Sequence, residues 1–266
     1  MLIPSSSLPL LKGRFPFRLG TTSYILPDAI VPNVLFLGPL LDEVELVLFE
    51  SGREDNLPTT REIEELAILA GEQKLTYNVH LPTDVLLGHP EAAIRQRACA
   101  TIMRFYERTM PLQPTMYCLH LENNTPGETA PPQIADWLTN LLYSLEDLLA
   151  AGMRRSLIGI ENINYTFPWI YPLIRELDLN ICLDIGHLLF QHEELETYLS
   201  LYGDKTIMLH LHGVEGQRDH RSLQGISDAN WQIIAAFLRD YRGGVSIEVF
   251  SQDDLARSLQ RMEDIL

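Results

Sequence analysis

The sequence predicts an α/β protein of the (β/α)8 barrel class, folded as a single domain. Short β-rich runs alternate with longer segments of helical spacing along the whole chain. There are eight such runs, and 266 residues is close to the usual length of a barrel of eight strand-helix units. The second candidate, a doubly wound open sheet, usually has a glycine-rich turn after its first strand, and Leu19-Gly20-Thr21-Thr22-Ser23 is not one. We assign residues 17–266 to the barrel and residues 1–16 to an N-terminal lead-in.

The predicted strands are runs of β-branched, aromatic and other apolar residues. They cover residues 17–24, 43–49, 75–81, 116–121, 157–161, 181–185, 207–212 and 245–250. Apolar residues at alternate positions are expected to face the helices, so the residues between them point into the barrel. Val79 and Leu81 flank His80 in this way. Asp184 lies between apolar neighbours in the same pattern.

Helix signals occupy the segments between the predicted strands. Thr59 and Glu62 have the spacing of a capping box at the start of an apolar stripe. Pro90 precedes a second predicted helix. A third has an apolar stripe over residues 134–148, with Pro131 and Pro132 before it and Gly152 at its end. A fourth covers residues 230–241, and Ser251 is the expected N-cap of the C-terminal helix.

The composition restricts the classes of partner. The chain has 36 acidic and 20 basic residues, a net charge of -16. Such a surface repels phosphate backbones and anionic membranes, so we expect no nucleic-acid and no membrane partner. No apolar run approaches the roughly 20 residues of a membrane helix, and the N-terminus lacks a signal-peptide pattern. With only three scattered cysteines as well, we expect a cytoplasmic protein.

Side chains that bind metals lie where the predicted strands end. In chain order they are His80, His120, Glu161, Asp184, His187, His210, His212 and Glu248. In a barrel these ends meet at one mouth, where the chemistry occurs. Carboxylates and imidazoles crowded there are costly to bury unless cations neutralise them. We therefore predict a metal centre, and the mixture of nitrogen and oxygen ligands suits Zn²⁺ or Mn²⁺.

These residues resemble the xylose isomerase-like barrel superfamily, which includes sugar isomerases, epimerases and endonuclease IV-type enzymes. The resemblance rests on His80-Leu81-Pro82, on Glu161-Asn162 and on residues 182–187, Cys-Leu-Asp-Ile-Gly-His. It implies a core metal site of four ligands, one from each of strands five to eight: Glu161, Asp184, His212 and Glu248. On strand seven both His210 and His212 point inward. We favour His212 as the ligand because it is nearer the strand end, with His210 supporting it from behind.

Additional residues match two branches of this superfamily. The endonuclease IV branch adds histidines on strands three and four, which implies ligation by His80 and His120 and a bridging role for Glu161. It binds a third ion through residues that correspond to His187 and His220, although its Asp-x-His motif is here Asp219-His220. The epimerase branch instead has a His-x-x-Glu-x-x-Arg run, and residues 212–218 satisfy that spacing.

The leading functional hypothesis is a metal-dependent phosphodiesterase that uses two or three Zn²⁺ or Mn²⁺ ions on a small molecule. Glu161, Asp184 and Glu248 are its expected catalytic residues. Residues 18–25 and 42–50 resemble the cobamide-remodelling phosphodiesterases, which implies a corrinoid whose nucleotide loop is opened. The expected substrate contacts are Arg218 and Arg221 for phosphate, and Tyr165 and Trp169 as an aromatic wall.

The same residues are compatible with two other functions. A sugar isomerase or epimerase would use one Mn²⁺ or Mg²⁺, with Glu161 and Glu248 as the proton-transferring pair and His80 and His120 as substrate contacts. A barrel that only binds a ligand is the weaker alternative. Cleavage of abasic-site DNA is disfavoured because the chain has no clustered basic residues.

Overall fold

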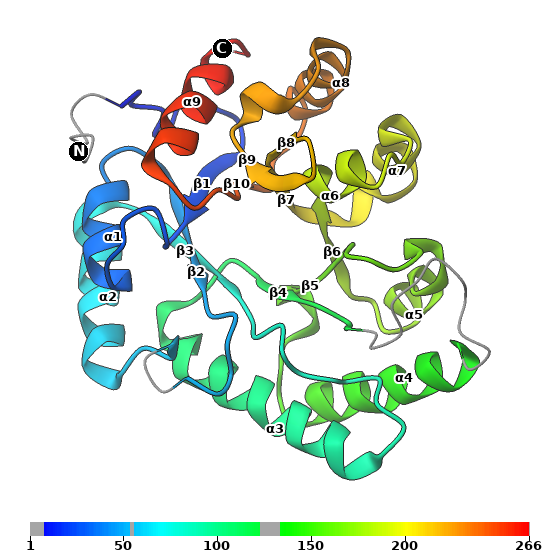
Figure 1. Ribbon diagram of the computed structural model, residues 1–266. Coiled ribbons are helices and arrows are strands. Elements are labelled where there is room, and N and C mark those ends of the chain that lie inside the picture. The colour runs from blue at the N-terminus through cyan, green and yellow to red at the C-terminus, as the bar shows by residue number, and fades with distance from the viewer. Residues whose placement is uncertain (1–7, 54–55, 123–133, 266) are drawn as a thin grey trace.

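A computed structural model of the chain describes residues 8–53, 56–122 and 134–265. Eight parallel strands close into a barrel in the order β1-β10-β7-β6-β5-β4-β3-β2, with the helices arranged around it (Figure 1). This confirms the predicted fold class. The barrel strands are β1 (Arg18–Thr22), β2 (Glu43–Val47), β3 (Thr76–His80), β4 (Tyr117–Leu119), β5 (Ile158–Glu161), β6 (Asn180–Asp184), β7 (Thr206–Leu211) and β10 (Gly244–Ile247), one for each predicted run.

The helices between the strands agree with the predicted signals where those signals are strong. The long ones are α2 (Thr60–Gln73), α3 (Ala92–Thr109), α4 (Ile134–Ala150), α8 (Asp228–Leu238) and α9 (Gln252–Glu263). Four shorter helices had no clear signal in the sequence: α1 (Ile30–Leu37), α5 (Tyr171–Glu176), α6 (Ile185–Phe190) and α7 (Leu195–Tyr202). A helix of about two turns shows too little periodicity to be recognised. Pro131 and Pro132 lie outside the described residues.

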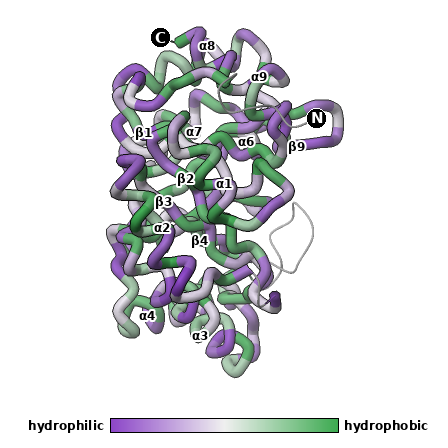
Figure 2. The backbone as a smooth tube through the Cα atoms, turned by 90° about the vertical axis from the view of Figure 1, so that its left-hand side faces the viewer, coloured by the Kyte–Doolittle hydropathy of each residue, from purple (hydrophilic) through white to green (hydrophobic). Residues whose placement is uncertain are grey.

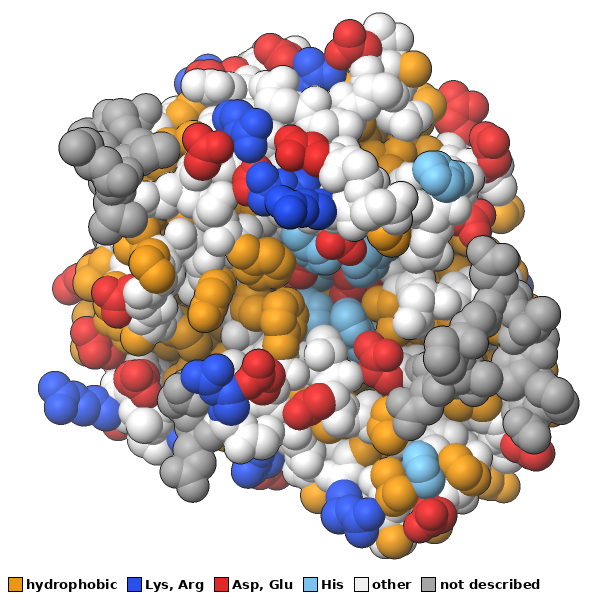
Figure 3. Space-filling view, in the orientation of Figure 1, with side chains coloured by type: hydrophobic (Ala, Val, Ile, Leu, Met, Phe, Trp, Pro, Cys, Tyr) orange, Lys and Arg blue, Asp and Glu red, His pale blue; other side chains and the backbone are white. Residues whose placement is uncertain are grey.

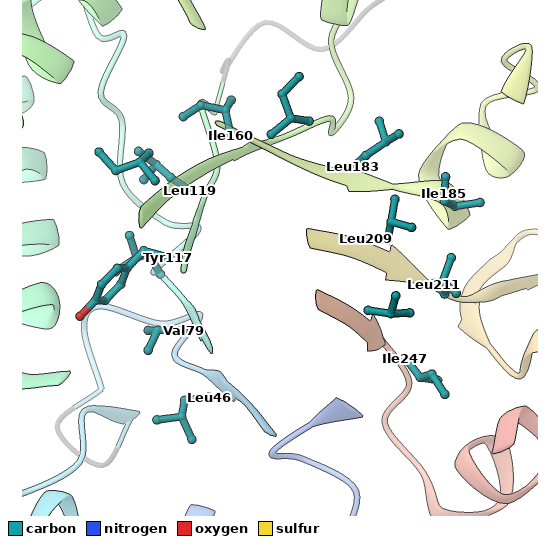
Figure 4. Close-up of a cluster of buried hydrophobic side chains, with 14 of the residues drawn as sticks. Leu46, Val79, Tyr117, Leu119, Ile160, Leu183, Ile185, Leu209, Leu211 and Ile247 are labelled. Carbon is teal, nitrogen blue, oxygen red and sulfur yellow. The ribbon is translucent and has the colours of Figure 1, made fainter. Parts of the chain in front are cut away.

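Most of the apolar core lies outside the barrel, between the strands and the helices. Alternate residues of each strand supply it, among them Val79, Leu183 and Leu209, and side chains of this layer follow the strands round the barrel in Figure 4. Hydrophobic and hydrophilic residues alternate along the helices in Figure 2, as expected for helices with one face on this layer. The inward positions of the strands are therefore free to carry polar side chains.

Part of the predicted lead-in packs on the barrel. Leu8 and Leu11 are buried in the main core. Lys12 donates hydrogen bonds through its Nζ to the carbonyl oxygens of Gly38, at 2.8 Å, and Leu41, at 2.7 Å. These carbonyls follow the end of α1, where a cation is favourable because unpaired carbonyls give the helix end a partial negative charge. Among the described residues, no helix is long and apolar enough to cross a membrane.

The loop after β7 forms a small antiparallel hairpin that the sequence did not predict. Its strands are β8 (Gly213–Glu215) and β9 (Arg218–Arg221). Gly213 is required there, because a Cβ at this position would lie 2.0 Å from the carbonyl oxygen of Ser222. The hairpin matters for the site since it carries His220 back toward the barrel mouth.

The capping box of α2 is confirmed and gives a test of local stability. Thr59 accepts a hydrogen bond from the Glu62 amide at 3.3 Å, and its own amide donates to Glu62 Oε2 at 2.7 Å. We expect Thr59→Ala to lower the free energy of unfolding by about 1 kcal/mol. Urea unfolding would measure this, with Thr60→Ala at the neighbouring exposed position as the control. Equal losses in the two variants would contradict a specific role for the cap.

Candidate metal centre

The carboxylate of Glu161, at the end of β5, is the centre of the site. It is buried, and three imidazoles lie within 3.2 Å of it, with a fourth, that of His187, at 3.8 Å. His80 Nε2 lies 3.2 Å and His120 Nε2 2.8 Å from Glu161 Oε2. His210 Nδ1 lies 3.2 Å from the other oxygen, Oε1. The two oxygens of one carboxylate thus point toward different sets of ligands.

The first set of possible ligands comes from β3, β4 and β5. His80, His120, Glu161 and Cys118 place one ligand atom each within 4.8 Å of one another. Other contacts hold the two rings: His80 Nδ1 lies 3.0 Å from the Leu81 carbonyl oxygen, and His120 Nδ1 lies 3.1 Å from Glu122 Oε1. Such contacts fix the orientation of an imidazole and leave its other nitrogen for a cation.

The second set contains the three carboxylates predicted to be catalytic. Glu161, Asp184 and Glu248 lie around His210, with one ligand atom of each residue within 4.8 Å of the others. His210 Nδ1 is 3.4 Å from Glu248 Oε2 and 3.9 Å from Asp184 Oδ2. All four side chains are at most 2% exposed. They come from β5, β6 and β7 and from the end of β10.

This arrangement differs from our expectation for strand seven. We favoured His212 as the residue that joins the three carboxylates, but the structure places His210 there. The reason is the strand register, since Asp184 on β6 pairs with His210 on β7. His212 lies two residues farther along the chain, nearer the mouth, and its Nε2 is 3.2 Å from Asp184 Oδ1.

A third set lies above the second. Asp184, His187, His212 and His220 again place one ligand atom each within 4.8 Å of one another. The His212 and His220 rings stack with centroids 4.1 Å apart, and the His220 amide donates to His212 Nδ1 at 3.0 Å. Gly186 permits this packing, because a Cβ there would lie 2.2 Å from the His212 ring. The structure thus brings together all nine residues predicted as metal ligands.

Burial and charge act in opposite directions on these groups. Burial alone would lower the pKa of His120, but the Glu161 charge and hydrogen bonds to Glu122 and Glu161 raise it to about 10. For His220, burial is likewise outweighed by Glu248, and its pKa rises to about 10. Burial would raise the pKa of Glu161, but His120 and His210 hold it well below its ordinary value. In the metal-free protein, protonated imidazoles therefore neutralise the carboxylates.

The donor atoms fit divalent cations. Asp184 Oδ2, His210 Nε2 and His212 Nε2 are buried and have no hydrogen-bond partner among the described residues. An unsatisfied buried polar atom is costly, and a cation would satisfy it. Imidazole nitrogens with carboxylate oxygens are ligands that Zn²⁺ and Mn²⁺ accept.

Comparison with known proteins identifies the family of the chain. Residues 41–265 match the family model of the xylose isomerase-like TIM barrel. The chain belongs to this family. A search of curated protein sequences gave no match.

Several solved structures have the same fold as this xylose isomerase-like barrel. A D-tagatose 3-epimerase-like protein is 20% identical with a TM-score of 0.71, over 94% of this chain and 97% of that one. The D-psicose 3-epimerase of Clostridium cellulolyticum is 15% identical with a TM-score of 0.72, over 94% and 98%. Endonuclease IV of Thermus thermophilus is 17% identical with a TM-score of 0.67, over 93% and 99%.

A cavity of about 270 Å³ opens above the candidate ligands of this family member. Figure 3 shows histidine and acidic side chains at its base and a hydrophobic area beside it. Phe49 and Phe250 line the cavity, with ring centroids 6.2 Å apart. The Phe49 ring also lies 4.6 Å from that of His80. Sequence reasoning missed both phenylalanines, although each is the last residue of a predicted strand and lies, like the ligands, at a strand end.

The predicted substrate contacts are not among the residues that line this cavity. Arg221 is engaged by Glu215 at 3.4 Å and by Asp254 at 3.1 Å, so its charge is already compensated. Arg218 is exposed on β9. Tyr165 is buried and donates its hydroxyl to the Glu161 carbonyl oxygen, so it supports β5 from behind. Trp169 is half-buried in a short 3-10 turn after β5.

Cation binding should release protons and strengthen as the pH rises. His120 and His220, with pKa values of about 10, are protonated at neutral pH and must lose that proton to bind a cation. We expect the affinity for Zn²⁺ or Mn²⁺ to increase from about pH 6 to about pH 9. Calorimetry in buffers of different ionisation enthalpy counts the protons released. His120→Gln should reduce that count, whereas His192→Asn, at an exposed position, should not. An affinity that does not change with pH would contradict this account.

Proposed function

We propose that this protein hydrolyses a phosphodiester bond of a small molecule, with two or three divalent cations at the barrel mouth. The observation that carries the proposal is the sharing of carboxylates between adjacent ligand sets. Glu161 belongs to the first and second sets, and Asp184 belongs to the second and third. A carboxylate with its two oxygens in different sets is suited to bridge neighbouring cations. Closely spaced cations are typical of enzymes that cleave phosphodiesters.

Divalent cations, when bound here, would supply Lewis acidity, charge compensation for the phosphoryl oxygens and a lowered pKa for water. The protein's own residues would orient the reactants. Glu122 lines the cavity beside His120, where it is placed to accept a proton from an attacking water. Phe49 and Phe250 would exclude water from one side of the cavity. Asp219 and Glu248 hold the His220 ring from its two nitrogens, at 3.2 and 3.3 Å.

The cavity wall favours a small substrate with an apolar part. Among the described residues, its lining includes neither Lys nor Arg, and the chain carries a net charge of -16, so a long phosphate backbone would be repelled. The Phe49 and Phe250 rings provide a surface on which a flat apolar group can stack. A corrinoid with a nucleotide loop combines such a group with one phosphodiester. It is the first substrate to test because residues 18–25 and 42–50 resemble cobamide-remodelling enzymes.

A sugar epimerase is the second candidate. The second ligand set alone would hold one cation, with Glu161 and Glu248 available to move a proton at a sugar carbon. The similar folds of a D-tagatose 3-epimerase-like protein and of a D-psicose 3-epimerase support this alternative. Against it, His80 and His120 both contact Glu161 directly, so that this carboxylate is held as a ligand rather than left free as a base.

Elemental analysis and a parallel assay separate the two candidates. We expect two or more cations per chain and cleavage of a cobamide by the metal-loaded protein, with no turnover of a ketohexose or of abasic-site DNA. Glu161→Gln should reduce hydrolysis by at least about 10²-fold, because the negative charge that two ligand sets share is lost and an NH2 group, which does not bind cations, replaces one of the two oxygens. One cation per chain together with sugar turnover would overturn the phosphodiesterase proposal and favour the epimerase.

The aromatic wall has a test of its own. Phe250→Ala should lower kcat/KM for a phosphodiester with a flat apolar group by about 10-fold, the equivalent of about 1.4 kcal/mol of stacking and burial. The same change should have little effect on a dialkyl phosphodiester, because such a substrate has no flat group to stack on the ring. Phe237→Ala, on α8 and away from the mouth, is the matched control. Equal losses for both substrates would contradict a stacking role.

A further inference from the structure

A cluster of sulfur atoms lies inside the barrel below the mouth. Met116, Cys118, Cys182 and Met208 are each at most 1% exposed and form a group separate from the main apolar core. Branched aliphatic residues dominate the interior of most such barrels. Sulfur is a soft ligand that prefers thiophilic cations such as Zn²⁺ and Cd²⁺ to hard ones. The interior is therefore chemically different from the oxygen-rich mouth above it.

The two thiols lie close to candidate metal ligands. Cys118 Sγ is 2.8 Å from Glu161 Oε2. Cys118, Cys182, Glu161 and His210 place one ligand atom each within 4.8 Å of one another, and all four residues are buried. In a tetrahedral Zn²⁺ site, with bonds of about 2.0 to 2.3 Å, the ligand atoms are roughly 3.3 to 3.8 Å apart. Small side-chain movements would bring these four atoms around one cation.

The strand register explains how thiols from β4 and β6 meet across β5. Cys118 pairs with Gly159 on one side of β5, and Cys182 pairs with Glu161 on the other. A Cβ at Gly159 would lie 3.4 Å from Cys182 Cβ and 2.5 Å from Met116 Cε. The glycine therefore leaves the space that the sulfur side chains occupy.

A second observation points to a ligand at this place. His210 Nε2 is buried and has no hydrogen-bond partner among the described residues. Its closest charged neighbour is Glu45 Oε1, at 3.3 Å. The other ring nitrogen, Nδ1, faces the carboxylates of the mouth. The two ring nitrogens thus face different acidic groups, Nδ1 toward Glu161 and Glu248 and Nε2 toward Glu45.

We propose that Cys118, Cys182, His210 and Glu161 form an inner cation site that selects thiophilic divalent ions. Binding releases the two thiol protons and the proton on the coordinating nitrogen of His210 to solvent, and it forms two metal-thiolate bonds beside the bonds to the imidazole and the carboxylate. Because Glu161 and His210 also belong to the mouth, an ion in the inner site withdraws two ligands from the second set. The inner site would therefore compete with the second set for these two ligands, whether the mouth carries out hydrolysis or epimerisation.

Cadmium titration tests the site, because a cadmium-thiolate bond absorbs in the ultraviolet and a cadmium-carboxylate bond does not. The full-length, metal-free wild-type protein should develop this absorption and saturate at one equivalent. Cys182→Ser is the decisive variant, since Cys182 belongs to the inner group alone, whereas Cys118 also lies in the first set. We expect Cys182→Ser to lose at least half of the absorption and to bind Cd²⁺ at this site at least about 10-fold more weakly.

Cys99→Ser is the matched control, because Cys99 lies on α3, outside the barrel, where its thiol contacts the Ser144 carbonyl oxygen. This variant should titrate as the wild type does. Unchanged absorption in Cys182→Ser, or none in the wild type, would overturn the proposal. If Cys182→Ser does not fold, wild-type crystals grown with Cd²⁺ decide the question. An anomalous peak within bonding distance of Cys182 Sγ supports the inner site, and peaks confined to the mouth refute it.

Discussion

The buried carboxylate of Glu161 is the constraint on which the rest of the mouth depends. An uncompensated carboxylate in the interior costs several kcal/mol, so every neighbouring group must neutralise or hydrogen-bond it. His80, His120 and His210 do so from three different strands. Their charges are in turn balanced by further acids, such as Glu122 beside His120. Exchange of these protons for cations would keep the same balance, which is why one geometry suits both the protonated and the metal-bound states.

This polar interior is possible because the apolar core lies elsewhere. The outward residues of the strands and the inner faces of the helices provide the hydrophobic burial, so the inward residues carry little of it. Glu45, for example, is completely buried inside the barrel, where Ser246 donates a hydrogen bond to it and His210 lies beside it. The other Glu45 oxygen, Oε1, and His210 Nε2 have no hydrogen-bond partner among the described residues, and a bound cation would compensate such buried atoms. The barrel thus separates stability, in the outer layer, from chemistry, along its axis.

Much of the fold and of the candidate site could be predicted from the sequence. Apolar alternation and the position of a strand end are both visible in short segments of the chain. Alternation of apolar residues identified every barrel strand, and the position of a strand end identified the candidate ligands. Alternation could not choose between His210 and His212, since residues two apart point the same way and only the register with β6 separates them. The hairpin that carries His220 was missed because its strands are short and polar. Phe250 was missed because an apolar residue at the end of a predicted strand resembles ordinary packing.

The type of ligand atom changes with depth along the barrel axis. Alternate strands contribute inward residues to successive layers. His80, Glu161 and His210 share one layer on β3, β5 and β7, and the thiols of β4 and β6 lie in the layer beneath. A cation that enters from the cavity therefore meets oxygen and nitrogen ligands before it meets sulfur. A hard ion binds oxygen ligands in preference to sulfur and is expected to stay at the mouth. A thiophilic ion forms stronger bonds with the two thiolates of the inner site. The identity of the ion, more than its charge, then determines how far it travels along the axis and whether Glu161 remains part of the mouth.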